Sequence, residues 1–177
     1  LLGLVGSEMC IRDRDIGAYD HLLFLVSISV VYSFKSWKKL FWIVTFFTIG
    51  HSMSLVISSY NIYKPNSEII EFLIPVTIII SALTNLFFLK STQKISYLTI
   101  LIALFFGLIH GFGFANFFNQ ITFNDGVDLV ALIGFSFGVE TAQILIATSI
   151  LILNSILFLI NPGTRKNYVR LISIIVC

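Results

Sequence analysis

The chain has 177 residues, of which 57% are hydrophobic and only 11% are charged. An ordinary soluble domain carries about 25% charged residues, so this composition excludes that class and favours a membrane protein. The 11 Lys and Arg residues against 9 Asp and Glu give a formal net charge of +2, too small to indicate a nucleic-acid surface. The two cysteines, Cys10 and Cys177, stand near opposite ends and exclude a CxxC metal or redox motif.

Five apolar stretches predict membrane-spanning helices, because about 20 apolar residues cross a hydrocarbon core ~30 Å thick. They are Gly17–Phe34, Leu40–Tyr60, Ile69–Leu89, Tyr97–Phe118 and Leu129–Ile160. The last is longer than a span requires and must tilt, break or project into water. A sixth stretch begins near Tyr168 and stops at Cys177, after about half a span. We therefore expect an all-α, polytopic transmembrane helical bundle with five full spans and a truncated sixth.

The basic residues predict how this bundle is oriented. The connections after the first, third and fifth stretches contain Lys35, Lys38, Lys39, Lys90, Lys94, Arg165, Lys166 and Arg170. The connections after the second and fourth stretches contain a single basic residue, Lys64. Because positive charge accumulates on the cytoplasmic side, we expect the N-terminus of the first helix to lie outside.

The first residues differ in character from the rest. Residues 1–14, LLGLVGSEMCIRDR, resemble translated sequencing-adapter sequence and lack the basic start and apolar run of a signal peptide. We expect them to be an assembly artefact or a non-native leader. Residues 15–177 are then expected to form a single transmembrane domain that is incomplete at both ends.

All three histidines and three carboxylates fall inside the predicted spans. A charged side chain at the bilayer centre costs about 2.5–3.5 kcal/mol, so such residues are functional candidates. They are Asp20, His21, His51, Glu71, His110 and Glu140. Counted from the outer ends of their spans, all six lie in the outer half or near the midplane. This shared depth predicts one site that includes at least His51, His110 and Glu140.

Polar and small residues accompany these candidates. Ser136, Glu140 and Gln143 share one helical face, and Thr48, His51 and Ser52 share another, so hydroxyl and amide groups could orient the stronger ligands. The GxxxG spacings Gly107–Gly111 and Gly134–Gly138 predict close helix packing. That packing could bring His110 near Glu140. The alternative is that these polar residues only pair helices.

The residue types indicate a divalent cation as ligand. Imidazole and carboxylate donors without thiolate suit Ni²⁺, Co²⁺, Zn²⁺ or Mn²⁺ and argue against Cu(I) or an iron–sulfur cluster. The adjacent Asp20 and His21 diverge by ~100° on a helix, so we expect one of them to be the closer ligand. The segment Gly134–Gly138 matches GxSxG, but a nucleophile elbow needs a strand-to-helix turn, and here the motif lies within a helix. We expect no enzyme.

Five segments resemble, in order and spacing, the signature blocks of the HupE/UreJ family. They are YDHLLFL (Tyr19–Leu25), TFFTIGHSMSL (Thr45–Leu55), IEFLIPVTIIISALTN (Ile70–Asn85), FGLIHGFGFA (Phe106–Ala115) and FSFGVETAQ (Phe135–Gln143). Members are small multi-pass proteins of the bacterial inner membrane, associated with hydrogenase and urease maturation and regarded as nickel or cobalt permeases. The resemblance implies metal-path roles for Asp20, His21, His51, His110 and Glu140, with Glu71 and Gln143 in support. Two positions depart from the pattern: Ser136 stands where Asn is usual, and Ala142 where Gly is usual.

Three hypotheses follow for the function. The first is a permease whose cargo is Ni²⁺ or Co²⁺, with Zn²⁺ also allowed by the ligands, and which holds no permanent cofactor. Its partners would be the lipid bilayer, the metal ion and hydrogenase or urease maturation proteins, and not nucleic acid. The second is a haem-b electron carrier with His51 and His110 as axial ligands. The third is a membrane scaffold for a maturation complex.

Overall fold

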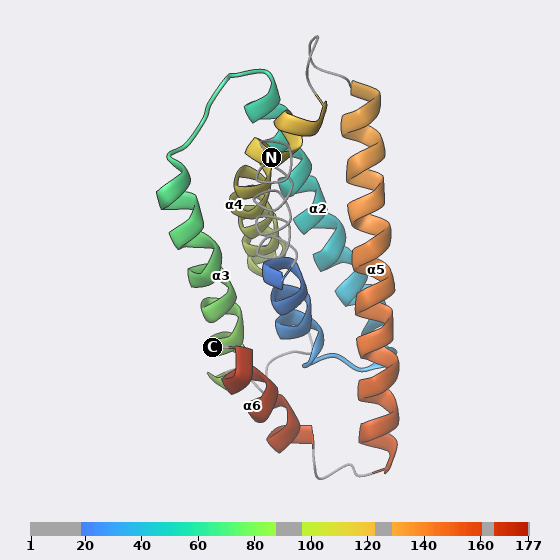
Figure 1. The fold of residues 1–177 in the computed structure, drawn as a ribbon. Helices are drawn as coiled ribbons and strands as arrows, with labels where there is room; N and C mark the ends of the chain where they lie inside the picture. Colours follow the sequence, from blue (N-terminus) through green and yellow to red (C-terminus); the bar gives the residue numbers. More distant parts are fainter. Residues whose placement is uncertain (1–18, 88–96, 123–128, 161–164, 177) are drawn as a thin grey trace, which may run out of the picture.

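The computed structural model describes residues 19–87, 97–122, 129–160 and 165–176, and these residues form helices joined by turns, with no strand among them. The chain is therefore all-α over its described length, as expected. A helix at Tyr19–Ser29 comes first. The 3-10 helix η1 (Phe34–Ser36) and the helices α2 (Trp37–Ser59), α3 (Ser67–Phe87), α4 (Tyr97–Thr122), α5 (Leu129–Ile160) and α6 (Arg165–Val176) follow (Figure 1).

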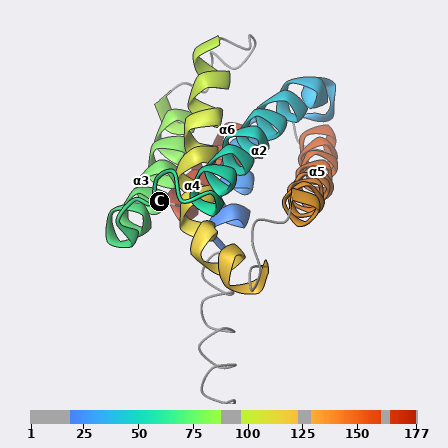
Figure 2. The ribbon, with the colours of Figure 1, turned by 90° about the horizontal axis from the view of Figure 1, so that it is seen from above.

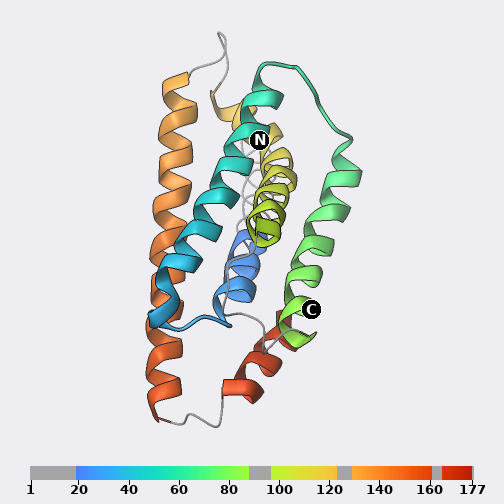
Figure 3. The same cartoon turned by 180° about the vertical axis from the view of Figure 1, so that it is seen from behind.

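The helices form a bundle around a central pair, α2 and α4. Helices α3 and α5 flank this pair on opposite sides, as seen both from the side (Figure 1) and from above (Figure 2). The Tyr19–Ser29 helix lies between the flanking helices, and the short α6 lies at the end of the bundle where α2 begins (Figure 3). The centre of the bundle is thus made of the first helix and α2, which are consecutive in the chain, together with α4, which comes much later.

Glycines allow the backbones of α2 and α4 to approach closely. A Cβ atom added to Gly107 would collide with the Phe47 carbonyl and lie 3.0 Å from the backbone nitrogen of His51. One added to Gly111 would collide with the His51 carbonyl. Only a residue without a side chain fits at either position. The α4 glycines therefore bring α4 directly against the turn of α2 that carries His51.

The second glycine pair does not pack in this way. A Cβ added to Gly134 or Gly138 would meet no described atom within 4 Å. The expectation that this GxxxG spacing mediates close packing is not met within the described residues, because α5 contacts α2 through a different face. Spacing alone identifies a small-residue stripe but not the direction in which it points.

Within the part of the chain that the structure describes, three helices are long and apolar enough to cross a membrane: Trp37–Ser59, Ser67–Leu86 and Leu132–Leu159. Two further apolar helical stretches are shorter over the described residues, Tyr19–Ser29 and Thr99–Ala115. Large apolar side chains are exposed on the outer surface of the bundle, including Val130, Ile133 and Phe137 of α5. Such a surface suits a lipid environment and not water.

The first helix is shorter at its C-terminal end than the predicted span, which reached Phe34. It ends at Ser29, and other helices donate hydrogen bonds to the carbonyls of Ser29 and of the residues that follow it. The buried Asn154 of α5 donates from Nδ2 to the carbonyls of Ser29 and Tyr32, each at 3.1 Å. Arg165 of α6 donates to the Val31 carbonyl at 3.0 Å. This cap is tertiary, so the local sequence does not reveal it.

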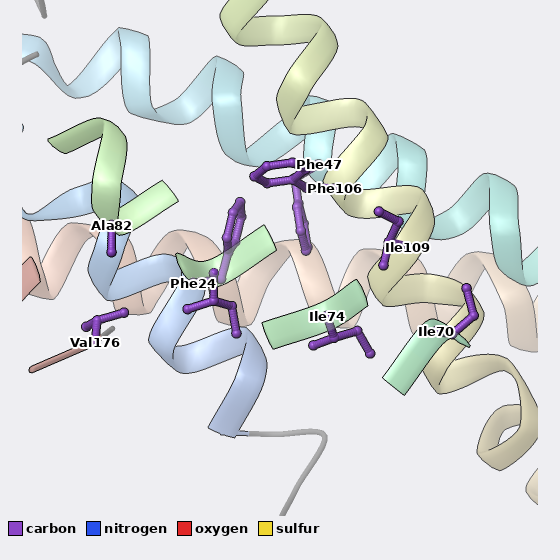
Figure 4. Packing of buried hydrophobic residues seen from close by; sticks show 9 residues of the cluster. Phe24, Phe47, Ile70, Ile74, Ala82, Phe106, Ile109 and Val176 are labelled. Atoms are coloured by element: carbon purple, nitrogen blue, oxygen red, sulfur yellow. The ribbon is translucent and has the colours of Figure 1, made fainter. Parts of the chain in front are cut away.

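Helix α5 is a single helix of 32 residues, so among the alternatives for the long fifth stretch a break does not occur. The last helix begins at Arg165, slightly before the predicted start near Tyr168. One apolar core cluster contains Phe24, Phe47 and Phe106, together with Ile70 and Ile74 of α3 and Ile109 of α4 (Figure 4). This apolar core adjoins the histidines.

Candidate metal-binding site

The three histidines, each from a different helix, meet in the centre of the bundle. The ring centroid of His21 lies 5.3 Å from that of His51 and 5.2 Å from that of His110. Both contacts are edge-to-face, with interplanar angles of 71° and 85°. The close approach of α4 to α2 brings His110 and His51 to the same level, and the first helix adds His21 beside them.

Burial leaves several of the imidazole nitrogens without hydrogen-bond partners. His51 and His110 are each only 1% exposed. Among the described residues, neither nitrogen of His51 has a partner, nor does Nδ1 of His110. An unsatisfied buried polar group costs about 1–3 kcal/mol, so a cluster of them is a costly arrangement that points to a ligand.

The remaining nitrogen of His110 contacts a residue that the sequence did not single out. Nε2 of His110 lies 3.0 Å from the hydroxyl of Thr77 in α3. Thr77 is buried, and its hydroxyl also contacts the carbonyl of Ile74 at 2.6 Å. A threonine within an apolar helix carries little signal, because it can bond to its own backbone.

Polar side chains join α2 to α5 in three pairs. Thr45 donates to Oε1 of Glu140 at 2.9 Å, and Thr48 lies 3.0 Å from Oε1 of Gln143. The third pair consists of the hydroxyls of Ser52 and Ser136, 2.9 Å apart. Thr45 was not predicted, although it shares the helical face of Thr48 and Ser52 and the same spacing would have found it.

The pairing gives Glu140 a partner on α2. The close packing of the α5 glycines that was expected to bring Glu140 near His110 is not seen among the described residues. Glu140 pairs with Thr45, which lies almost two turns along α2 from His51. Gln143, which is buried, retains an Nε2 group that has no partner among the described residues.

Two further candidates lie at the edges of this region. Asp20 is half-buried next to His21, and Glu71 is exposed in the second turn of α3. Within the described ranges, no group of three or more His, Cys, Asp or Glu side chains is arranged to hold a metal ion. The three imidazoles are thus in contact, but their donor atoms do not converge on one point.

Phenylalanines enclose the histidines at both ends. Phe24, Phe47 and Phe106, here called the Phe24 layer, each lie one helical turn from a histidine, toward the end of the bundle where α2 begins. Phe24 stacks on Phe47 with 4.7 Å between centroids. On the opposite side, Phe114 and Phe135 stack at 5.0 Å, and both lie within 6.3 Å of the His51 ring. The three histidine rings therefore lie between two aromatic layers, in a part of the bundle here called the chamber.

These features define a class: a helical protein suited to a membrane, with clustered histidines in its interior. A family model described as HupE / UreJ protein matches residues 16–177, nearly the whole chain. The chain belongs to the HupE/UreJ family. No curated protein and no solved structure gave a significant match.

Proposed function

We propose that this chain is a multi-pass permease of the bacterial inner membrane that carries Ni²⁺ or Co²⁺ for metalloenzyme maturation. The observation that carries the proposal is the meeting of His21, His51 and His110 in the interior. Membership of the HupE/UreJ family supports it. The clustering supplies the ligand type that these borderline cations prefer.

The cation is the substrate, and the imidazoles would replace part of its water shell. Among the described residues both nitrogens of His51 and Nδ1 of His110 lack partners, so binding at one nitrogen of each ring would satisfy a group that is otherwise buried without one. Over the part of the chain that the structure describes, the donor atoms do not converge on one point, so binding would require the side chains, and the helices that carry them, to rearrange. A site that is not fully assembled suits transport, because a carrier must release its substrate.

The carboxylates have separate roles in this proposal. Asp20 is half-buried beside His21 and adds negative charge at the entry to the chamber. Glu140 and Gln143 hold α5 against α2 through Thr45 and Thr48, and they become ligands only if α5 shifts. Glu71, exposed near the start of α3, would attract cations before entry.

The two aromatic layers provide the barriers that a carrier requires. The Phe24 layer closes the chamber on the side of the basic residues Lys38, Lys39, Arg165, Lys166 and Arg170, which belong to α2 and α6 at one end of the bundle (Figure 1). By the positive-inside rule this side is cytoplasmic. Phe114 and Phe135 close the outer side. In this proposal the opening of one layer would admit the cation and the opening of the other would release it.

The haem alternative fits this geometry less well. A haem needs its two axial histidines on opposite faces of the macrocycle. Here the ring of His21 contacts both His51 and His110, and Phe24 and Phe47 fill the adjoining space. The metal-carrier proposal uses all three histidines, whereas in the haem alternative the His21 ring would occupy space that the macrocycle needs.

Uptake of radiolabelled nickel tests the proposal in cells that lack their own nickel importers. Expression of the parent should raise uptake above the empty vector, and the double variant His51→Ala, His110→Ala should return it to that level. Thr141→Ala is the control, because this exposed hydroxyl bonds to the Phe137 carbonyl of its own helix. Equal uptake by the parent and the double variant, at equal amounts in the membrane, would contradict the proposal.

A further inference from the structure

Thr77 of α3 contacts His110 of α4. This contact constrains which ring nitrogen of His110 carries the hydrogen. The Thr77 hydroxyl oxygen is 2.6 Å from the Ile74 carbonyl oxygen and 3.0 Å from Nε2 of His110. Both side chains are buried: that of Thr77 in α3 is 3% exposed, and that of His110 in α4 is 1% exposed.

The hydrogens of this arrangement can be assigned from its chemistry. Two oxygens 2.6 Å apart require a hydrogen between them, and the Ile74 carbonyl has none to give. The single hydroxyl hydrogen of Thr77 is therefore donated to Ile74. Toward His110 the hydroxyl presents only a lone pair, so Nε2 must be the donor.

A neutral imidazole carries one hydrogen, so a hydrogen on Nε2 leaves Nδ1 with a free lone pair. Nδ1 of His110 is buried and has no partner among the described residues. We propose that Thr77 is a positioning residue that holds His110 as its Nε2–H tautomer, which makes Nδ1 the atom that binds the cation. The part concerning the cation rests on the proposed function, whereas the tautomer does not.

The role of Thr77 resembles that of an outer-shell group in a metal site. Such groups accept a hydrogen bond from the non-ligating ring nitrogen and fix both the tautomer and the ring orientation. Their loss typically lowers metal affinity about 10- to 100-fold. A hydroxyl on α3 would thus set the ligand atom of α4 without touching the cargo.

The test uses the full chain in lipid nanodiscs with ¹⁵N-labelled histidine and NMR spectra of the ring nitrogens. The signals of His110 are identified by their loss in His110→Asn. In the metal-free parent, Nε2 should give the signal of a protonated nitrogen and Nδ1 that of an unprotonated one. Thr77→Ser should preserve this pattern, and the near-isosteric Thr77→Val should change it. A protonated Nδ1 in the parent, or a Thr77→Val spectrum identical to the parent, would overturn the inference.

Nickel binding to the same preparations separates this inference from the proposed function. Thr77→Val should bind Ni²⁺ at least tenfold more weakly than the parent, with Thr77→Ser within a few-fold of it. If the parent shows the expected tautomer but binds no Ni²⁺, the proposed function fails while the tautomer assignment stands. If the parent binds Ni²⁺ and Thr77→Val binds equally well, the role of Thr77 is overturned while the permease survives. If Thr77→Val does not fold, the spectra of the parent and of Thr77→Ser still decide the tautomer.

Discussion

The imidazole of His21 stands edge-on to that of His51, with 5.3 Å between the ring centroids. The two residues come from helices that enter the bundle from opposite ends, so nothing local in the sequence pairs them. The contact forms because the first helix lies against the central α2–α4 pair. The proposed cation-carrier function depends on this central arrangement.

The packing of α2 against α4 predicts a difference between two glycine pairs. Gly107→Ala should lower the free energy of unfolding by about 1–3 kcal/mol, because the new Cβ collides with the Phe47 carbonyl. Gly134→Ala is the matched control, since its Cβ would meet no described atom within 4 Å. Thermal unfolding of both variants in the same detergent measures the difference. Equal melting temperatures for the two would show that α4 does not approach α2 so closely.

The cap on the first helix predicts that Asn154 stabilises the fold. Asn154→Leu should lower the free energy of unfolding by about 1–3 kcal/mol, because the carbonyls of Ser29 and Tyr32 lose the hydrogen bonds from the buried Asn154. Ser149→Ala, on the exposed face of the same helix, should have little effect because the Ser149 hydroxyl bonds to the Leu145 carbonyl of its own helix. Unfolding in denaturant compares the two, and an Asn154→Leu variant as stable as Ser149→Ala would refute the cap.

The hydrogen bond between Thr45 and Glu140 allows the negative charge of Glu140 to be removed while its role in helix pairing is kept. Glu140→Gln keeps an oxygen that can accept from Thr45, so the melting temperature should stay near that of the parent. Nickel uptake should nevertheless fall about tenfold, because the amide has no negative charge to stabilise the passing cation. Unaltered uptake would remove Glu140 from the metal path and leave it a helix-pairing residue.

The Phe24 layer predicts which substitution opens the chamber to the cytoplasmic side. The variant His51→Cys provides a reporter thiol in a chain that also carries Cys10→Ser and Cys177→Ser. This thiol should react slowly with thiol reagents applied from either side of the membrane. Adding Phe47→Ala removes a ring that stacks on Phe24, so the reaction with reagent from the cytoplasmic side should become at least tenfold faster. Phe137→Ala, an exposed position on α5, is the control. Equal rates in the two variants would mean that Phe47 is not a barrier.

Much of the fold follows from the sequence, because apolar length and charge distribution are local properties. The predicted stretches Leu40–Tyr60, Ile69–Leu89 and Leu129–Ile160 overlap α2, α3 and α5 within a few residues. The sequence also predicts equal depth for His51 and His110, because depth depends only on distance from a helix end, and the structure brings His21 into contact with both rings. Nearly the whole chain matches the family model that the motifs indicated.

The rest could not be predicted because it depends on which helix faces which. The carbonyl at the end of the first helix, that of Ser29, accepts a hydrogen bond from Asn154, a residue on another helix. The direction of Gly134 and the pairing of Glu140 depend on the rotation of α5 about its axis, which sequence spacing does not define. Thr77 gave no signal at all, since a hydroxyl in an apolar helix needs no partner outside its own backbone.

X-ray absorption of the nickel-loaded protein tests the central claim most directly, because imidazole ligands give characteristic multiple scattering. The account predicts at least two imidazoles on the Ni²⁺ of the parent. It also predicts one fewer in each of His51→Ala and His110→Ala, with Thr141→Ala unchanged. A nickel ion surrounded only by oxygen, or a spectrum that the histidine variants leave unaltered, would show that the three histidines do not form the metal path.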